Sequence, residues 1–177
     1  MDQTIVNECW RSISGFIDYQ VSNLGRVRSV GSGKILTPCD NGRGYDNVYP
    51  YKDKKRHVLK LHRLVAQEWL DKPLGDDGVM LEVDHVDRNK KNDQVTNLRW
   101  ATRKQNIMNW CKQRRSCSSV FKGVSFHGQS GKWRSTIKVD GVTMSLGLYQ
   151  SETEAARAYN AKAFEVHGEY AYLNPLP

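Results

Sequence analysis

The stretch that decides the fold runs from Leu81 to Asn106 and reads LEVDHVDRNKKNDQVTNLRWATRKQN. Residues 81–86 are expected to form a strand, and the polar residues 87–96 that follow predict a loop. A second short strand is expected at 97–101. The predicted order is therefore strand, loop and strand, with the acidic and histidine side chains near the end of the first strand.

A helix is expected to follow, because Thr102 and Gln105 have the spacing of a capping box. This helix would carry Asn106, which comes twenty-two positions after Asp84. Hydrolysis of a phosphodiester needs a nucleophile made from water and a cation that stabilises the charge developing on phosphate. Mg²⁺ takes few protein oxygens, so Asp84 and Asn106 could hold it, and His85 could accept the proton of the attacking water.

One geometric condition applies to this centre. Consecutive residues of a regular strand point to opposite faces, so Asp84 and His85 can reach one phosphate only if the strand ends or bends there. The polar stretch 87–92 favours such an end.

The wider pattern of residues 58–110 resembles the HNH homing endonucleases found in phage introns and intergenic regions. This resemblance implies a ββα-metal fold, with His85 as general base and with Asp84 and Asn106 as ligands of one Mg²⁺ or Mn²⁺ ion. It also implies that Asn97 ties the hairpin together and orients the histidine. Asn106 replaces the last histidine of the family pattern, which disfavours zinc at this centre. The resemblance rests on Leu61-His62-Arg63-Leu64-Val65-Ala66, Val83-Asp84-His85-Val86-Asp87-Arg88-Asn89-Lys90-Lys91-Asn92 and Asn97-Leu98-Arg99-Trp100-Ala101-Thr102.

Other prominent side chains near this pattern are assigned as follows. His62 could be interpreted as a further metal ligand, but it is expected to be structural and to pack at the start of a helix. Trp69 and Trp100 are expected in the core. A loop of cations can simply be solvated, but beside a phosphate-cutting centre we expect backbone contact. The residues predicted to make such contact are Arg88, Lys90 and Lys91, together with Arg103 and Lys104 at the start of a basic stretch.

The N-terminal segment, residues 1–57, predicts a small sheet. In Arg26-Val27-Arg28 the alternation places Val27 on the face opposite the two cations, as in a half-buried hairpin. The segment from Trp10 to Ser29 resembles the modular domain that often precedes HNH nucleases and is thought to bind DNA. Two cations on one face of a ribbon can follow a groove. The alternative is a sheet that only supports the nuclease.

The C-terminal segment predicts strands at 120–126, 132–139 and 142–149, the last two joined by Asp140-Gly141. Ser151 and Glu154 form a capping box for a helix rich in alanine, which Gly168 would end. Residues 118–175 resemble the DNA-binding domain of plant APETALA2 and ethylene-response factors. In that family the sheet lies in the major groove. The resemblance implies as DNA readers Lys122, Ser125, His127, Lys132, Arg134, Thr136 and Lys138, although Ser125 and His127 stand where the plant domains commonly have arginines.

Composition agrees with a polyanionic partner. The 177 residues carry a formal net charge of +8, and the isoelectric point is about 9.4. Hydrophobic residues make up 38% and no apolar run could span a bilayer, so we expect no membrane contact. No secretory signal is recognised, which indicates the cytoplasm, that of the host cell if the protein is phage-encoded. The four cysteines lack the spacing of a zinc site and are interpreted as free thiols.

We therefore expect an α+β chain: a small N-terminal antiparallel sheet, a central ββα-metal motif, and a C-terminal three-stranded antiparallel sheet on one helix. The predicted domains are 1–57, 58–117 and 118–177. The expected function is site-specific cleavage of double-stranded DNA at an extended site by a monomer. The alternatives are a DNA-binding regulator with an inactive nuclease remnant, and a non-specific degradative nuclease.

Overall fold

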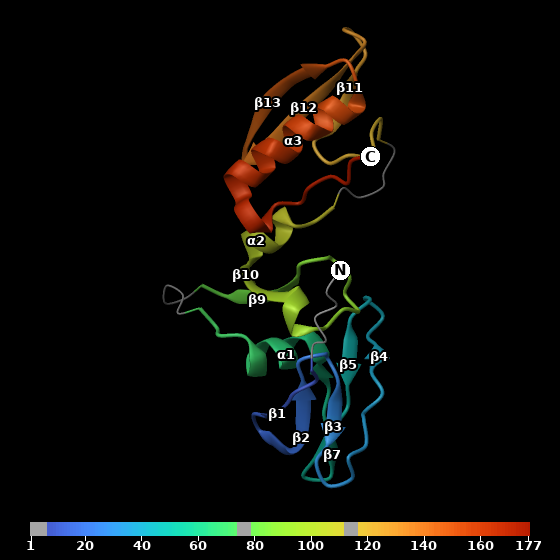
Figure 1. The fold of residues 1–177 in the computed structure, drawn as a ribbon, viewed down its shortest axis with the longest axis vertical. Coiled ribbons are helices and arrows are strands. Elements are labelled where there is room, and N and C mark those ends of the chain that lie inside the picture. Colours follow the sequence, from blue (N-terminus) through green and yellow to red (C-terminus); the bar gives the residue numbers. More distant parts are fainter. Residues whose placement is uncertain (1–6, 74–78, 112–116) are drawn as a thin grey trace. The chain divides into compact units, whose positions relative to one another are not determined.

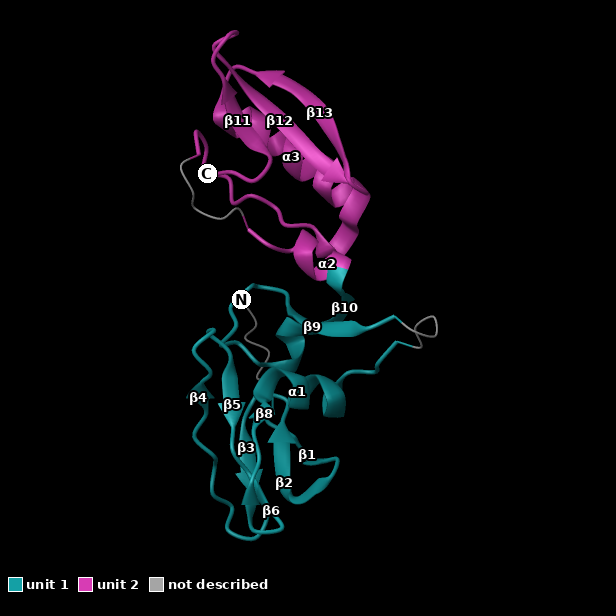
Figure 2. Cartoon of the chain, turned by 180° about the vertical axis from the view of Figure 1, so that it is seen from behind, with its two compact units in different colours: residues 1–103 teal, residues 104–177 magenta. Residues whose placement is uncertain are grey.

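The computed structural model describes residues 7–73, 79–111 and 117–177. The chain divides into two compact units, residues 1–103 and residues 104–177 (Figure 2). Each unit combines helices with antiparallel sheet, which confirms the α+β prediction.

The N-terminal part of unit 1 is built from short antiparallel strands. The predicted hairpin is present, with Val27 buried, Arg26 exposed and Gly25 in the turn at φ +76°. One sheet has the order β1-β2-β3, another the order β4-β5-β8, and β6 pairs with β7. Their bounds are β1 Trp10–Ile13, β2 Phe16–Ser22, β3 Val27–Ser29, β4 Cys39–Asp40, β5 Asp46–Val48, β6 Tyr51–Lys52, β7 Lys55–Arg56 and β8 Leu59–Lys60.

Helix α1, Leu61–Trp69, begins directly after β8. Its apolar face is Leu61, Leu64 and Val65, which recur at helical spacing and are all buried. They join one core with side chains of both the N-terminal strands and the later hairpin, so α1 lies between these two parts of the unit (Figure 1). The buried members of this core are Ile13, Val21, Val27, Val48, Leu61, Leu64, Val65 and Leu98.

Residues 81–106 fold in the predicted order of strand, loop, strand and helix. A two-stranded antiparallel sheet is followed by a helix, with His85 opposite Leu98 and Asp84 opposite Arg99. The helix begins at Arg103, one residue after the strand ends, so the chain turns sharply at this point. The bounds are β9 Leu81–His85, the 3₁₀ turn η1 Val95–Asn97, β10 Leu98–Thr102 and α2 Arg103–Met108.

Unit 2 is a three-stranded sheet, order β11-β12-β13, covered on one face by a helix (Figure 1). Asp140 and Gly141 have φ values of 48° and 86°, the left-handed conformations that a two-residue hairpin turn requires. Both bonds of the Ser151–Glu154 capping box are present, and Gly168 caps the other end of the helix. The bounds are β11 Val124–His127, β12 Lys132–Val139, β13 Val142–Tyr149, α3 Glu152–His167 and the 3₁₀ turn η2 Gly168–Tyr170.

Alanines explain how closely α3 approaches the sheet. Ala155, Ala156 and Ala163 are buried against it, together with Tyr159. At the opposite wall of this small core, a Cβ on Gly123 would lie 2.1 Å from the Tyr159 ring. Gly123 has φ +77°, so both its conformation and its lack of a side chain are required here.

Packing divides the chain differently from the three predicted domains. The N-terminal strands and the hairpin of residues 81–102 share the core described above, and the boundary between compact units falls at 103/104. The functional boundary at 57/58 stays a prediction, and the hydrophobic core of unit 1 is continuous across it.

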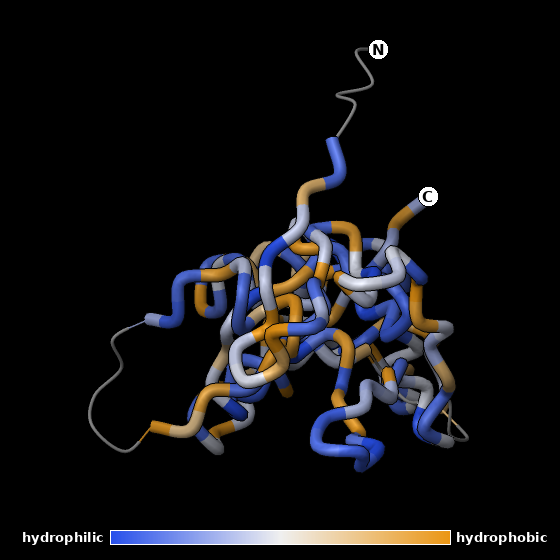
Figure 3. Tube along the Cα trace, turned by 90° about the horizontal axis from the view of Figure 1, so that it is seen from below, coloured by the Kyte–Doolittle hydropathy of each residue, from blue (hydrophilic) through white to orange (hydrophobic). Residues whose placement is uncertain are grey.

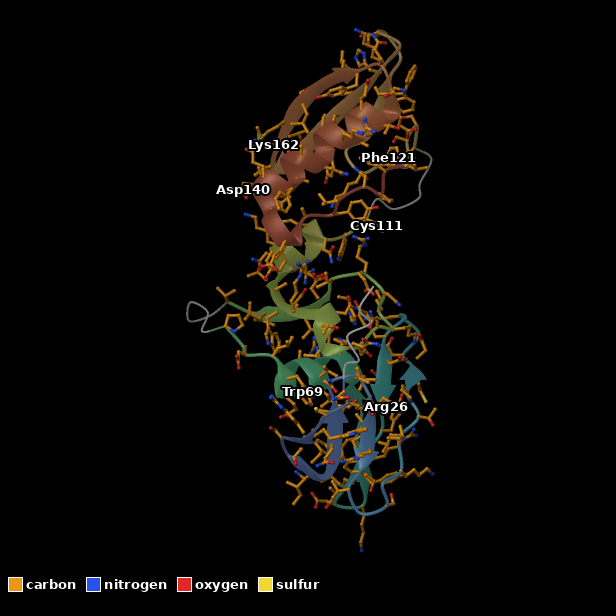
Figure 4. All side chains as sticks on the ribbon, in the orientation of Figure 1. Arg26, Trp69, Cys111, Phe121, Asp140 and Lys162 are labelled. Atoms are coloured by element: carbon orange, nitrogen blue, oxygen red, sulfur yellow. The ribbon has the colours of Figure 1, made fainter. Side chains whose placement is uncertain are left out.

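Apolar stretches of the trace are short (Figure 3). Across the described residues, no helix combines the length and apolarity that a membrane span requires. The four cysteines, of which Cys111 is labelled in Figure 4, are exposed and unbridged, as predicted.

Candidate active site

The paired residues Asp84 and His85 lie at the C-terminal end of β9, and His85 is its last residue. Both side chains are 5% exposed. Both residues pair within the β9–β10 ladder and the strand ends only after His85, so the condition that both groups serve one phosphate stays a prediction. The two side chains contact different residues of the protein.

Asp84 is held by the arginine opposite it on β10. Arg99 donates from Nε and Nη2 to the same carboxylate oxygen, Oδ2, at 2.9 and 2.8 Å. Both side chains are largely buried, so this is a charge-assisted pair in a weakly solvated place. A carboxylate has further lone pairs on two oxygens, and this pair alone does not exhaust its capacity as a metal ligand.

His85 is held by a buried carboxylate from the loop that follows β9. Its Nε2 lies 2.9 Å from Oδ1 of Asp93, which is 4% exposed. The rings of His62 and Tyr45 lie beside it, with centroids 5.4 and 6.0 Å from that of His85. His62 packs at the start of α1, where it was predicted, and its ring lies against that of His85.

Donor atoms of His62, His85 and Asp93 all lie within 4.8 Å of one another. Nδ1 of His62 and Oδ2 of Asp93 are buried without a hydrogen-bond partner. Burial, reinforced by electrostatic interaction with His85 and with the cations of Arg63 and Lys60, lowers the pKa of His62 to about 3. His62 is therefore a neutral imidazole at physiological pH.

Asn97 closes the loop between the two strands. Its Nδ2 donates to Oδ1 of Asp87 and to the carbonyl of Asn92, both at 2.8 Å, and its Oδ1 accepts from the Asp87 amide at 2.9 Å. The backbone carbonyl of Asn97 accepts from the Val86 amide. These bonds fix the segment directly after His85, which is the geometry that the tying role predicted for Asn97 requires.

The N-terminal hairpin also supports this loop. The Val95 amide donates to the carbonyl of Asn23 at 2.9 Å. Next to it, a Cβ on Gly25 would lie 2.9 Å from the Asp93 carbonyl oxygen. The turn of the β2–β3 hairpin thus contacts the backbone of the residue that holds His85.

Asn106, the other predicted metal ligand, lies on α2 and belongs to the second compact unit. Its role opposite Asp84 stays a prediction.

Two cations predicted to contact DNA bind the protein itself. Lys91 forms ion pairs with Asp40 at 2.6 Å and Asp46 at 2.7 Å, and these bonds raise the pKa of the Lys91 ammonium. Lys90 donates to the carbonyl of Arg43 at 3.1 Å. The physical reason is proximity: the N-terminal loops bring their carboxylates and carbonyls to residues that are distant in sequence. Arg88, in the same loop, is exposed with φ +65°.

The cations around α2 are exposed. The side chain of Arg103 is 82% exposed and lies 3.9 Å from Glu82, and Lys104 pairs with Asp140, which lies in the β12–β13 turn (Figure 4). The basic stretch that continues to Arg115 includes residues 112–116, which lie outside the described residues.

One face of the unit 2 sheet carries most of the predicted DNA readers. On β12, Ser135 and Ile137 are buried, so the alternate residues face away from α3. The register places Ser125 opposite Arg134 and His127 opposite Lys132. The outward set is Ser125, His127, Lys132, Arg134, Thr136 and Lys138.

Lys122 does not belong to this outward set. Its Nζ donates to the carbonyls of Met108 and Trp110 at 2.8 and 2.7 Å, so it secures the segment that enters unit 2. In the N-terminal sheet, Arg28 stacks on Trp10 at 4.3 Å and bonds Gln20, whereas Arg26 pairs with Glu8.

Comparison with known proteins bears on this arrangement. Residues 8–49 match the NUMOD4 motif, and residues 60–108 match the HNH endonuclease family. The second match covers β9, β10 and α2 with Asp84, His85, Asn97 and Asn106. The chain belongs to the HNH endonuclease family.

A curated sequence and a solved structure, both of I-HmuI, extend the comparison. DNA endonuclease I-HmuI of Bacillus phage SP01 is 41% identical over 101 residues, which are 56% of each chain. The chain thus spans little more than half of that relative in sequence. A solved structure, titled "DNA binding and cleavage by the HNH homing endonuclease I-HmuI", matches with a TM-score of 0.52 and 29% identity over 90% of this chain and 91% of the other.

A separate likeness is to a plant protein. APETALA2-like protein 2 of Oryza sativa is 38% identical over 60 residues, which are 34% of this chain and 14% of the rice protein. This likeness is partial and covers a domain-sized segment only.

Sequence reasoning missed two residues of the site, Asp93 and Arg99. Arg99 faces Asp84 across the hairpin, so the predicted pairing of two strands could have found it. Asp93 stands in a polar loop among other acids and amides, and no local pattern distinguishes it. Its role depends on the loop folding back onto His85.

Proposed function

We propose that this protein is a metal-dependent, site-specific DNA endonuclease that hydrolyses phosphodiester bonds. The observation that supports this most strongly is the position of Asp84 and His85 at the end of β9, across a hairpin from Asn97, within a segment that matches the HNH endonuclease family. The likeness to I-HmuI supports DNA as the substrate class, and the proposed substrate is double-stranded DNA.

The residues of the proposed metal centre fit a hard cation. A buried carboxylate from Asp84 and an amide oxygen from Asn106 are the donors that Mg²⁺ or Mn²⁺ accepts while keeping positions for water and phosphate. One such ion, when bound, stabilises negative charge developing on the scissile phosphate. Arg99 holds the Asp84 carboxylate in one orientation through its two bonds to Oδ2.

His85 accepts the proton of the attacking water in this proposal. Asp93 acts as a positioning residue, because its carboxylate fixes the proton of the neutral imidazole on Nε2 and thereby sets the Nδ1 atom as the acceptor. Asn97 holds the loop after His85 in place, so the ring has a defined direction toward the phosphate.

Recognition of an extended site is assigned to basic surfaces in both units of the chain. The outward face of β11 and β12 presents Lys132, Arg134 and Lys138, and the resemblance of residues 118–175 to APETALA2 DNA-binding domains favours DNA as its ligand. In unit 1, Arg26 and Arg88 are exposed cations. A monomer with one such centre would cut one strand in each binding event.

The test uses the full chain with duplex DNA from the region that flanks its own gene, and cleavage is mapped on both strands. Wild-type protein should cut at a defined position only when Mg²⁺ or Mn²⁺ is present. Asp84→Ala and His85→Ala should bind the same DNA without cutting it. Undiminished cleavage by either variant would reject the mechanism, and binding without metal-dependent cleavage by wild type would favour a regulator with an inactive nuclease remnant. Scattered cut positions would indicate a degradative nuclease.

A further inference from the structure

We propose that His62, His85 and Asp93 form a second cation site, separate from Asp84 and Asn106, which takes a transition-metal dication such as Zn²⁺ and thereby withdraws His85 from catalysis. The second half of this statement rests on the proposed function, because it assumes that His85 is the general base. The first half concerns binding alone.

The site is built from three segments that converge in the interior. His62 comes from the first turn of α1, His85 from the end of β9 and Asp93 from the loop before η1. Each side chain is at most 5% exposed, and donor atoms of all three lie within 4.8 Å of one another. Ligands around a zinc ion lie at about 2.0–2.2 Å from the metal, so small side-chain shifts would bring these donors to it.

Two atoms of the cluster have unused bonding capacity. His62 Nδ1 and Asp93 Oδ2 are buried and make no hydrogen bond, although each belongs to a strongly polar group. Burying a polar atom without a partner is unfavourable, and the described side chains around these atoms supply none. A cation bound between the three residues would give such atoms a partner.

The donor set selects the type of cation. Two imidazoles and one carboxylate suit borderline ions such as Zn²⁺ and Co²⁺, whereas Mg²⁺ prefers oxygen donors and a wetter site. The ion would also neutralise the buried charge of Asp93.

Occupation of this site would change the proton on His85. The imidazole now shares Nε2–H with Asp93 Oδ1. If Nε2 binds the cation, the neutral ring carries its proton on Nδ1 and has no lone pair left to accept one from water. The cation at this site would therefore act as an inhibitor that competes with the Asp93–His85 hydrogen bond.

Binding is tested by cobalt absorption spectroscopy on the full chain, without DNA. The exposed thiols would bind cobalt as well, so all proteins carry the four substitutions Cys9→Ser, Cys39→Ser, Cys111→Ser and Cys117→Ser. We expect the visible bands of four- or five-coordinate Co²⁺, displaceable by Zn²⁺, in this background and in Asp84→Ala. His62→Gln should weaken cobalt binding by at least about tenfold.

Two results would overturn the site. One is a folded parent protein that gives no such bands, and the other is a signal lost in Asp84→Ala but kept in His62→Gln. Circular dichroism verifies that each variant is folded, and Asp93→Asn, which removes the anionic ligand, gives an independent variant with the same expectation as His62→Gln.

Inhibition is tested by adding Zn²⁺ to cleavage reactions that contain saturating Mg²⁺. The half-inhibiting Zn²⁺ concentration should rise by at least about tenfold in His62→Gln, each variant being compared with its own zinc-free rate. An unchanged concentration would assign inhibition to another ion position and refute the regulatory role. If the protein cuts no DNA at all, the proposed function fails. The cobalt spectra still show whether His62, His85 and Asp93 bind a cation.

Discussion

His85 and Asp93 form a buried pair, with Nε2 and Oδ1 2.9 Å apart, although Asp93 comes eight positions after His85 in the sequence. The first prediction concerns this pair. Asp93→Asn should lower kcat by roughly tenfold, and Asp93→Ala by up to about a hundredfold, with KM little changed, because the imidazole loses its fixed proton position rather than its contact with DNA. Single-turnover cleavage and DNA-binding titrations measure the two quantities.

A purely structural role for Asp93 would leave a different signature. Nitrogen NMR of the His85 ring should report a changed tautomer balance in Asp93→Asn while the protein remains folded. Equal cleavage rates in all three proteins would contradict the positioning role.

The Asp84–Arg99 pair predicts a specific pattern of stabilities. Arg99→Leu leaves a buried carboxylate without its arginine and should lower the free energy of unfolding of unit 1 by roughly 3 kcal/mol. The double variant Arg99→Leu with Asp84→Leu should lose less than the sum of the two single variants, because no charge is left unpaired. Urea unfolding of all four proteins completes the cycle, and additive losses would show that the two side chains are not coupled.

Gly25 supplies a prediction with a matched control. Gly25 and Gly15 both have positive φ, but a Cβ would meet the Asp93 carbonyl oxygen at 2.9 Å only at Gly25. Gly15→Ala should cost about 1 kcal/mol of stability from its backbone conformation alone, with cleavage unchanged. Gly25→Ala should cost more and also slow cleavage, since the loop that holds His85 must shift. Thermal unfolding and cleavage rates are measured for both, and identical behaviour would argue against the contact.

The outward face of the unit 2 sheet is tested by Arg134→Ala, with Arg157→Ala on α3 as a control of the same residue type. Arg134→Ala should weaken DNA binding, and the slope of log affinity against log salt should decrease by about one if the arginine contacts a phosphate. Arg157→Ala should leave both quantities unchanged. Equal effects of the two variants would indicate nonspecific attraction by net charge.

Alkaline pH should destabilise unit 2 through Tyr159. Burial raises the pKa of this phenol to about 12, against about 10 in an unfolded chain. The unfolded chain therefore ionises first, and the stabilising contribution, complete below pH 10, is lost as the pH rises toward 12. The loss attributable to this residue is up to about 2–3 kcal/mol. Urea unfolding of Tyr159→Phe between pH 9 and 12 should show a weaker dependence than wild type, and parallel curves would contradict the assignment.

Local patterns predicted the fold well. The strands at 132–139 and 142–149 have their predicted bounds, because strict alternation and an Asp-Gly turn determine them without distant help. The strand expected at 120–126 begins only at Val124, because Gly123 takes a left-handed conformation that a strand does not allow.

The candidate site was predictable only in part, because several of its contacts join distant segments. Asp84, His85 and Asn97 stand out by their spacing in one hairpin. The DNA contact of Lys91 stays a prediction, but its ion pairs with Asp40 and Asp46, which lie 51 and 45 positions earlier in the chain, were not predicted. Alternation and capping describe neighbours in sequence, and they carry no information on which loop supplies a counterion.

The shared core of unit 1 has a consequence for engineering and for gene shuffling. Replacing residues 1–57 with another recognition module would remove Val21, Val27 and Val48 from beneath α1 and the turn that supports Asp93, so a transplanted nuclease segment should misfold or lose activity. A junction placed after Met108 leaves that core whole and keeps Asn106 with the nuclease. If the two sheets read the target as proposed, we expect new target preferences to be acquired more readily by exchanging the C-terminal sheet than by exchanging the N-terminal one.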